Sequence, residues 1–475
     1  MTLDDVSQIA EAPRGHAAFK ALTEGRKRRL ADLVALSPKR DPFCAGTPGQ
    51  VKLAEWFHGI WQQYVTSAKA HLRRIHYLLV SQADPRKADG MPYLNTEAHW
   101  QILQEASTYA RYLGLVDPRA IEDHRNPEPH LPFLWEQVED EPRSGWDLEE
   151  IQWTLPTITT DLAADLEFLF PEPRVTGYDY SLIHQVYHLE VWIEKSTMND
   201  VLLPVVRRSG AVLVTSVGFQ SVTSAVQLIT QRVKRDGKPT RLFYISDFDP
   251  AGDRMPVALA RQIEYWLKEF APDADIKLQT LALTRDQVQH YQLPRVPIKE
   301  TDMRKASFED RYGEGAVELD ALEALHPGVL AELVQEALAS YIDDTLEEQL
   351  AETADDAQAA AAARWLTEAQ SWRDELATIQ AEVEAICARF APQLEQLADA
   401  FEQELAPHWT ALRALQRTVT RAMRTFQPDL PERPQAAEVS EEETTWLYNS
   451  ARSYMEQLRA YKAHSNGVHP EETDE

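Results

Sequence analysis

Residues 241–253 read RLFYISDFDPAGD, and this stretch decides the fold. Its apolar first half is typical of a buried β-strand. Because side chains alternate along a strand, Asp247 and Asp249 can point the same way from its C-terminal end, where open α/β sheets bind their ligands. A structural alternative is that Asp249, followed by Pro250, is an ordinary helix cap.

Strand patterns alternate with helical patterns on both sides of this stretch. The apolar strands read VYHLEVWIE (186–194), AVLVTS (211–216) and IKLQTLAL (276–283), and helical patterns run through QLITQRV (227–233) and ALARQIEYWL (258–267). This alternation predicts a parallel sheet with covering helices.

A third acid follows another of these strands. VYHLEVWIE ends at Glu194, and Lys195 comes next. If the two strands are neighbours, Glu194 would meet Asp247 and Asp249 at one edge of the sheet. Carboxylate oxygens with open water positions suit Mg²⁺, and phosphoryl chemistry is then the natural interpretation.

Composition limits the classes of protein to which the chain can belong. The 475 residues are 44% hydrophobic and 26% charged, which is ordinary globular usage. The sequence shows no apolar run of membrane-spanning length and no signal-peptide pattern, so we expect a cytoplasmic protein without a membrane association. Cys44 and Cys387 form no metal-binding motif, and we expect buried, reduced thiols.

The charge is unevenly distributed. The net charge is −28, which argues against nucleic-acid binding by the surface as a whole. Residues 1–90 nevertheless carry 14 Lys and Arg against 9 Asp and Glu, with RKRR at 26–29, whereas residues 341–475 carry 11 against 27. Phosphate binding depends on local charge, so DNA contacts are expected in the N-terminal third.

The flanking regions complete the predicted organisation. An apolar stripe over 51–80, a loop, a helix capped by Asn95 or Thr96 and a short extended segment fit a winged-helix unit. A helix is expected within 157–185, and apolar residues stepping by threes and fours predict a coiled-coil arm near the C-terminus. The expected fold is a multidomain α+β protein with a basic N-terminal extension (1–50), a winged-helix-like domain (51–126), a connector (127–185), an α/β domain with a parallel sheet (186–340), a helical arm (341–425) and an acidic, mobile tail (426–475).

Three blocks of the sequence resemble one family. A strand ending in Glu-Lys, followed about fifty residues later by DFDPAG, is similar to the Toprim domain of the topoisomerase VI A subunit and the related meiotic double-strand-break transesterase. RRIHY at 73–77 matches the family's Arg and nucleophilic tyrosine, and AVELDAL at 316–322 matches a Glu-containing block. The loop at 217–226 departs from the family pattern because no acid or proline follows Phe219.

The resemblance implies a Mg²⁺-dependent enzyme that cuts DNA. Tyr77 would attack a backbone phosphate and give a 5′-phosphotyrosyl link, while Glu194, Asp247 and Asp249 would hold the metal. The helix phase agrees, because Tyr77 falls opposite the apolar residues and beside two arginines. The roles expected for the remaining residues are phosphate binding by Arg73, Arg74 and Lys195, with Arg73 also acting in catalysis, a base at His76 and a further acid at Glu318.

Other functions stay open. The metal site could activate water instead, as in a nuclease of a plasmid or phage defence system or of a mobile element. A third possibility is a non-catalytic DNA-binding assembly protein. The resemblance also implies a homodimer in which Tyr77 of one subunit faces the metal of the other. Since no Walker A motif is present, ATP-driven strand passage would need a separate ATPase subunit or a defence-system partner.

Overall fold

A computed structural model describes residues 13–24, 29–65, 69–123, 126–132, 143–153, 168–216, 218–390, 394–441 and 446–466. The chain divides into two compact units, each formed by segments that are distant in sequence. Unit 1 comprises 1–137, 185–342 and 437–475, and unit 2 comprises 138–184 and 343–436. No helix among the described residues has both the length and the apolar character needed to cross a membrane.

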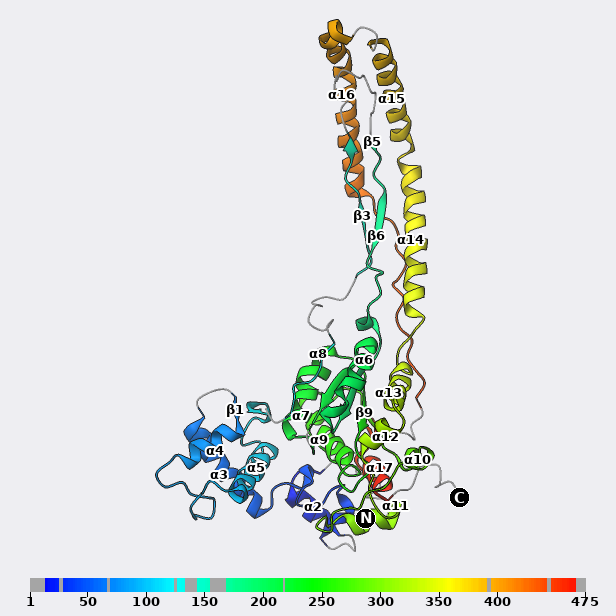
Figure 1. Cartoon of the computed structure of the whole chain (residues 1–475). Helices are drawn as coiled ribbons and strands as arrows, with labels where there is room; N and C mark the ends of the chain where they lie inside the picture. Colours follow the sequence, from blue (N-terminus) through cyan, green and yellow to red (C-terminus); the bar gives the residue numbers. More distant parts are fainter. Residues whose placement is uncertain are drawn as a thin grey trace. The chain divides into compact units, whose positions relative to one another are not determined.

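The core of unit 1 is a five-stranded sheet (Figure 1). Its strands are β7 (His188–Ile193), β8 (Val212–Thr215), β9 (Thr240–Ile245), β10 (Ile276–Ala282) and β11 (Tyr448–Asn449), in the spatial order β11-β10-β9-β7-β8. Strands β7 to β10 pair in parallel, which confirms the predicted parallel sheet. The strand β11 adds an antiparallel edge.

Alternating side chains of the sheet divide the core of unit 1 into two layers. Leu242 and Tyr244 of β9 pack on one face, and Phe243 and Ile245 pack on the other. The first face is covered by α7 (Val222–Gln227) and α9 (Met255–Phe270), and the second by α6 (Asn199–Ser209) and α13 (Val329–Ala339). Shorter helices follow the last parallel strand: α10 (Arg285–His290), α11 (Lys305–Tyr312) and α12 (Leu319–Leu325).

A charged group is buried inside the first layer. Glu190 of β7 is fully buried and accepts hydrogen bonds from Arg232 Nε at 2.6 Å and from Trp192 Nε1 at 2.6 Å. Arg232 lies in the π-helical turn Leu228–Val233, which joins α7 to α8 (Lys234–Asp236). Burial favours protonation of Glu190, but the charge of Arg232 and the bonds from His188 outweigh it and lower the pKa of Glu190 to about 2.

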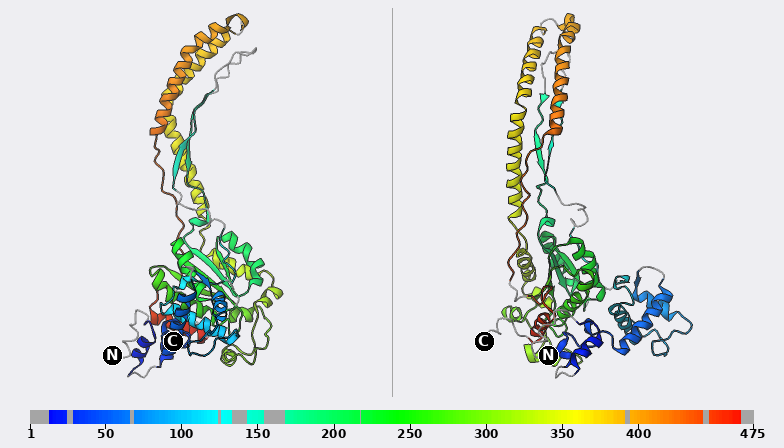
Figure 2. Two further views of the ribbon diagram at one scale, coloured as in Figure 1. Left: turned by 90° about the vertical axis from the view of Figure 1, so that its left-hand side faces the viewer. Right: turned by 180° about the vertical axis from the view of Figure 1, so that it is seen from behind.

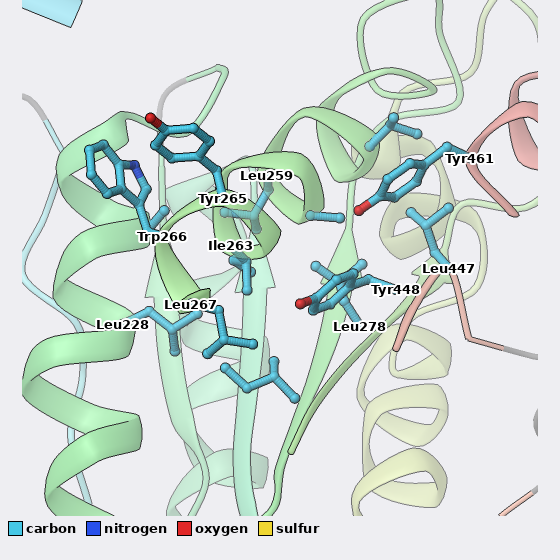
Figure 3. Packing of buried hydrophobic residues seen from close by; sticks show 14 of the residues in the cluster. Leu228, Leu259, Ile263, Tyr265, Trp266, Leu267, Leu278, Leu447, Tyr448 and Tyr461 are labelled. Atoms are coloured by element: carbon cyan, nitrogen blue, oxygen red, sulfur yellow. The ribbon is translucent and has the colours of Figure 1, made fainter. Parts of the chain in front are cut away.

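The C-terminal segment is part of the core, in contrast to the predicted mobile tail. Leu447, Tyr448 and Tyr461 lie within the apolar cluster that Figure 3 shows against α9. The helix α17 (Tyr454–Asn466) follows β11, and Tyr454 donates a hydrogen bond to Leu33 O at 2.7 Å. Apolar burial therefore orders residues 446–466 despite the acidic residues around them.

The N-terminal part of unit 1 is helical. Its elements are α2 (His16–Thr23), α3 (Pro48–Tyr64), β1 (Ala70–His71), α4 (Leu72–Val80), α5 (Glu97–Tyr112) and β2 (Ile121–Glu122). Thr96 caps α5 by accepting a hydrogen bond from His99 N at 3.3 Å, as predicted. The side chains of Arg111 and Thr223 join this part to α7 at 3.2 Å. Most of RKRR (26–29) lies outside the described residues.

Unit 2 is built around a helical hairpin. Its helices are α14 (Leu346–Glu368), α15 (Gln370–Phe390) and α16 (Leu394–Thr425), and its strands are β3 (Gly145–Leu148), β4 (Gln152–Trp153), β5 (Phe168–Leu169) and β6 (Pro173–Thr176). Figure 2 shows α15 and α16 side by side. Their contacts run antiparallel, because Phe390 meets Phe401 while His408, further along α16, meets Glu382. The predicted helical character of this C-terminal region is confirmed.

The predicted connector is wrong in one respect. Residues 138–184 belong to unit 2 and not to a linker between domains. There β6 lies against α14, because Gln358 donates a hydrogen bond to Pro173 O at 2.7 Å and accepts one from Val175 N at 2.8 Å. The expected helix within 157–185 falls partly outside the described residues. Its later part forms β5 and β6, because cross-strand pairing and packing on α14 outweigh local helix preference.

Candidate active site at the carboxyl edge of the parallel sheet

Three of the predicted acids lie at the ends of neighbouring strands. The strands β7 and β9 pair in parallel with Ile193 opposite Ile245, so Glu194 and the segment 246–249 leave the sheet together. The backbone amide of Glu194 donates a hydrogen bond to Ile245 O at 3.2 Å. The two strands are therefore neighbours, which is the condition on which a meeting of Glu194 with Asp247 and Asp249 depends.

A tight turn holds Asp249. Its Oδ1 accepts hydrogen bonds from the backbone amides of Ala251 at 2.8 Å and Gly252 at 2.6 Å. The helix cap that the Asp-Pro pair allowed is not formed, because α9 begins only at Met255 and Arg254 is its N-cap residue. A Cβ atom on Gly252 would lie 2.0 Å from Asp247 O, so the turn requires glycine at this position. The turn contacts use Oδ1, and Oδ2 of Asp249 is the atom that could turn toward a ligand.

A distant segment completes the site. Phe248 and Val317 exchange two backbone hydrogen bonds of 2.9 Å, which bring residues 316–320 beside the turn. Leu319 N then donates to Asp247 Oδ1 at 2.6 Å. Glu318 and Asp320 reach the same edge, and we call Glu194, Asp247, Asp249, Glu318 and Asp320 the acidic cluster.

Lys195 lies inside the acidic cluster. Its Nζ is 2.5 Å from Glu318 Oε2, 2.7 Å from Asp320 Oδ2 and 3.0 Å from Asp247 Oδ1. Burial alone would lower the pKa of Lys195, but the hydrogen bonds to these carboxylates raise it above its ordinary value. The ammonium is therefore committed to carboxylates, in contrast to its predicted role of binding DNA phosphate.

Glu194 carries the strongest electrostatic signal. Burial, and then the negative charges of Asp247 and Asp249, raise the pKa of Glu194 from 4.5 to about 7. Its Oε2 is buried and has no hydrogen-bond partner among the described residues. Burial also raises the pKa values of Asp247 and Asp249. Even with Lys195 nearby, the ionised form of Glu194 beside two other carboxylates is unfavourable, and a further cation would stabilise it.

The residues present fit a divalent cation in charge and ligand type, since hard oxygen donors of this kind bind Mg²⁺. As the side chains are placed, however, the described part of the chain contains no group of three or more His, Cys, Asp or Glu side chains with the geometry of a metal site. Binding would thus require carboxylate rotations. The orphaned Glu194 Oε2 is the atom most directly placed to gain a partner.

The predicted nucleophile lies on a different element. Tyr77 of α4 is 53% exposed, which agrees with its predicted phase opposite the buried Ile75 and Leu79. Arg73 and Arg74 are exposed as well, and the guanidinium of Arg73 lies 4.5 Å from the centre of the Trp100 ring. Among the described residues, no hydrogen bond or ion pair joins α4 to the acidic cluster.

His76 differs from its predicted role as a base. It is 1% exposed, and its Nδ1 and Nε2 lie 2.8 Å from Tyr93 Oη and 3.1 Å from Asn95 Oδ1. Both ring nitrogens are therefore used in holding the loop before α5. His76 lies on the buried side of α4 with Ile75 and Leu79, so its role is structural.

Two site residues were missed by the sequence analysis. Asp320 is ion-paired with Lys195, and Arg304 lies near enough for its positive charge to favour the ionised form of Asp249. Asp320 had a weak signal, since it stands two residues after Glu318 in AVELDAL. Arg304 stands in a charged stretch of the sequence, where no local pattern marked it as a site residue.

Comparison of the chain with protein-family models and with curated proteins found no match.

Proposed function

We propose that the acidic cluster is a Toprim-type Mg²⁺ site and that the protein cleaves DNA by tyrosine transesterification. The observation that carries the proposal is the meeting of Glu194, Asp247 and Asp249 at the ends of paired strands, with the pKa of Glu194 raised to about 7. Burial of Glu194 and its repulsion by Asp247 and Asp249 both disfavour the ionised carboxylate, and a bound divalent cation would offset both effects. The resemblance of the sequence blocks to the Toprim family supplies the choice of DNA as substrate.

The residues would divide the work as follows. Glu194, Asp247 and Asp249 hold Mg²⁺, which when bound stabilises negative charge on the attacked phosphate. The Tyr77 oxygen forms a bond to phosphorus, and the bond from phosphorus to the 3′ oxygen breaks. The phenol proton passes to solvent, and the departing 3′ oxygen takes up a proton. Arg73 and Arg74, on the same helix as Tyr77, hold phosphate oxygens.

The placement of Tyr77 favours action across two chains. The helix α4 packs on α3 and α5, and among the described residues no hydrogen bond or ion pair links it to the acidic cluster of its own chain. In the proposed symmetric homodimer, Tyr77 of one protomer serves the acidic cluster of its partner, so two such pairs cut both strands.

The same separation supports a second candidate, a nuclease in which water attacks the phosphate and Tyr77 has no chemical role. Such an enzyme would suit a plasmid or phage defence system or a mobile element. The two candidates differ in whether a covalent link forms between Tyr77 and the DNA.

Covalent capture separates the candidates. Wild-type protein is incubated with supercoiled plasmid and Mg²⁺, denatured rapidly and tested for protein bound to DNA ends. We expect an adduct with wild type and with the control Tyr64→Phe, and loss of both adduct and cleavage with Tyr77→Phe. Cleavage by Tyr77→Phe without an adduct in wild type would establish the water mechanism. Absence of cleavage by wild type with Mg²⁺ and with Mn²⁺ would favour a non-catalytic DNA-binding protein.

A further inference from the structure

One face of α16 in unit 2 is lined with arginines. All four are exposed and step by four, four and three residues: Arg413, Arg417, Arg421 and Arg424. At ~100° per residue they fall within an arc of about 80°. Buried side chains of the same helix lie on the opposite side and pack on α15 and its neighbours: Leu405, Leu412, Leu415 and Val419. We call these four arginines the arginine face.

The arginine face stands out against an acidic background. Residues 343–436 contain 18 Asp and Glu, 8 Arg and no Lys. The stretch 405–428 contains no Asp or Glu, and half of the 8 arginines stand within it. Four exposed cations on one helix face repel one another, which is unfavourable for the isolated helix. A ligand that neutralises them would account for the pattern.

These guanidinium groups are also unpaired. Elsewhere in the hairpin, Arg364 pairs with Glu368 at 3.1 Å and Arg389 pairs with Glu404. Within the described parts of the chain, no ion pair reaches Arg413, Arg417, Arg421 or Arg424. The Nε of Arg417 donates to the backbone oxygen of Arg413 at 3.2 Å, so even this contact leaves the charge uncompensated.

The spacing identifies the class of ligand. The arginine face extends for ~16 Å along the helix at ~1.5 Å per residue. A nucleic-acid duplex presents a continuous row of phosphates, with about one charge per 1.7 Å of its axis, and arginine binds phosphate bidentately. A protein partner is less suitable, because no large exposed apolar side chain is found on the described residues of α16 and exposed ion pairs alone contribute little.

We propose that the arginine face binds the phosphate backbone of a DNA duplex, independently of base sequence. The inference rests on the proposed function in one respect, the choice of DNA as the polyanion. It adds a second contact region, carried by the helical arm and separate from Tyr77 and the acidic cluster. The arm would hold the duplex without taking part in the chemistry.

The test compares salt dependence in the full-length protein. Binding of a fluorescent DNA duplex is measured in EDTA, so that cleavage plays no part, from about 50 to 200 mM salt. Each phosphate contact contributes ~0.9 to the slope of log affinity against log salt concentration. Changing all four arginines to Gln should reduce the slope by ~3 to 4, so wild type should lose roughly 100-fold more affinity than the variant over this range.

A matched control removes four exposed cations from unit 1 by changes to Gln at Arg207, Arg208, Lys234 and Arg459. We expect its slope to stay within about one unit of the wild-type slope. Equal slopes for wild type and the arginine-face variant, with both folded by circular dichroism, would overturn the inference. So would loss of self-association by the arginine-face variant with unchanged DNA affinity, because the ligand would then be a second copy of the chain.

The outcome is distinguishable from failure of the proposed function. If the arginine face binds DNA but plasmid is never cleaved, the inference stands and the chemistry is wrong. If plasmid is cleaved with Mg²⁺ but the salt slope does not depend on the four arginines, the chemistry stands and the inference is wrong.

Discussion

Replacing Glu194 by Gln should stabilise the metal-free protein while abolishing its response to Mg²⁺. Burial and the charges of Asp247 and Asp249 raise the pKa of Glu194 from 4.5 to about 7, so ionising this group in the folded state is unfavourable. Its raised pKa means that its contribution to stability is intact below pH 4.5 and is lost as the pH rises to about 7. Gln keeps the shape of the side chain and cannot ionise.

The size of the effect follows from the shift. At ~1.4 kcal/mol per pKa unit, the rise in the pKa of Glu194 from 4.5 to about 7 gives an upper bound of about 3.5 kcal/mol. Glu194 is partly exposed, so solvent screening reduces the expected gain to ~1–2 kcal/mol at pH 8. At pH 5 wild-type Glu194 is already protonated in the folded state, and most of the gain should disappear. Saturating Mg²⁺, at ~100 times its dissociation constant, should stabilise wild type by ~2.7 kcal/mol at pH 8 and leave Glu194→Gln nearly unchanged.

Scanning calorimetry suits this measurement because it can separate the unfolding of the two units. The control is Glu336→Gln, which changes an exposed carboxylate on α13 and should have little effect at either pH. The reasoning would be refuted if Glu194→Gln were less stable than wild type at pH 8, or if its advantage were the same at pH 5 and pH 8.

Two further changes test the surrounding structure. Glu190→Gln should destabilise the protein by ~3–5 kcal/mol, because it leaves the buried guanidinium of Arg232 without its counter-charge. Denaturant unfolding at pH 7 measures this loss. A loss below about 1 kcal/mol would show that the ion pair between Glu190 and Arg232 is not needed for stability. Gly252→Ala should cost ~1–3 kcal/mol and remove the stabilisation by Mg²⁺, because its Cβ would lie 2.0 Å from Asp247 O and displace the turn that holds Asp249; a normal Mg²⁺ response in this variant would mean that the turn does not position the metal ligands.

Local patterns were sufficient for the sheet and for three of its acids. The strands β7 to β10 are short and rich in apolar residues, and the Asp-Phe-Asp alternation follows β9 after one serine. Their parallel pairing follows from the intervening helices, and it places Glu194 beside Asp247. The helical hairpin was predictable for the same reason, since its apolar periodicity is long.

Contacts between distant segments were not predictable. Asp320 reaches the site because Phe248 pairs with Val317, a bridge that no local pattern indicates. The acidic residues around 446–466 suggested mobility, yet Trp446 and Tyr461 are buried in the core of unit 1. The helix α16 also continues through Pro407, because packing of neighbouring residues on α15 compensates for one missing backbone hydrogen bond.

The acidic cluster is proposed to perform Mg²⁺-dependent DNA cleavage. The most direct measurement is conversion of supercoiled plasmid by wild type and by Asp247→Asn, each with Mg²⁺ and with EDTA, with folding checked by circular dichroism. Asn preserves the size of the side chain and the acceptor for Leu319 N but removes the charge. We predict that plasmid is cut only in the reaction that contains wild-type protein and Mg²⁺. Equal cleavage by Asp247→Asn, or cleavage by wild type that persists in EDTA, would contradict the claim.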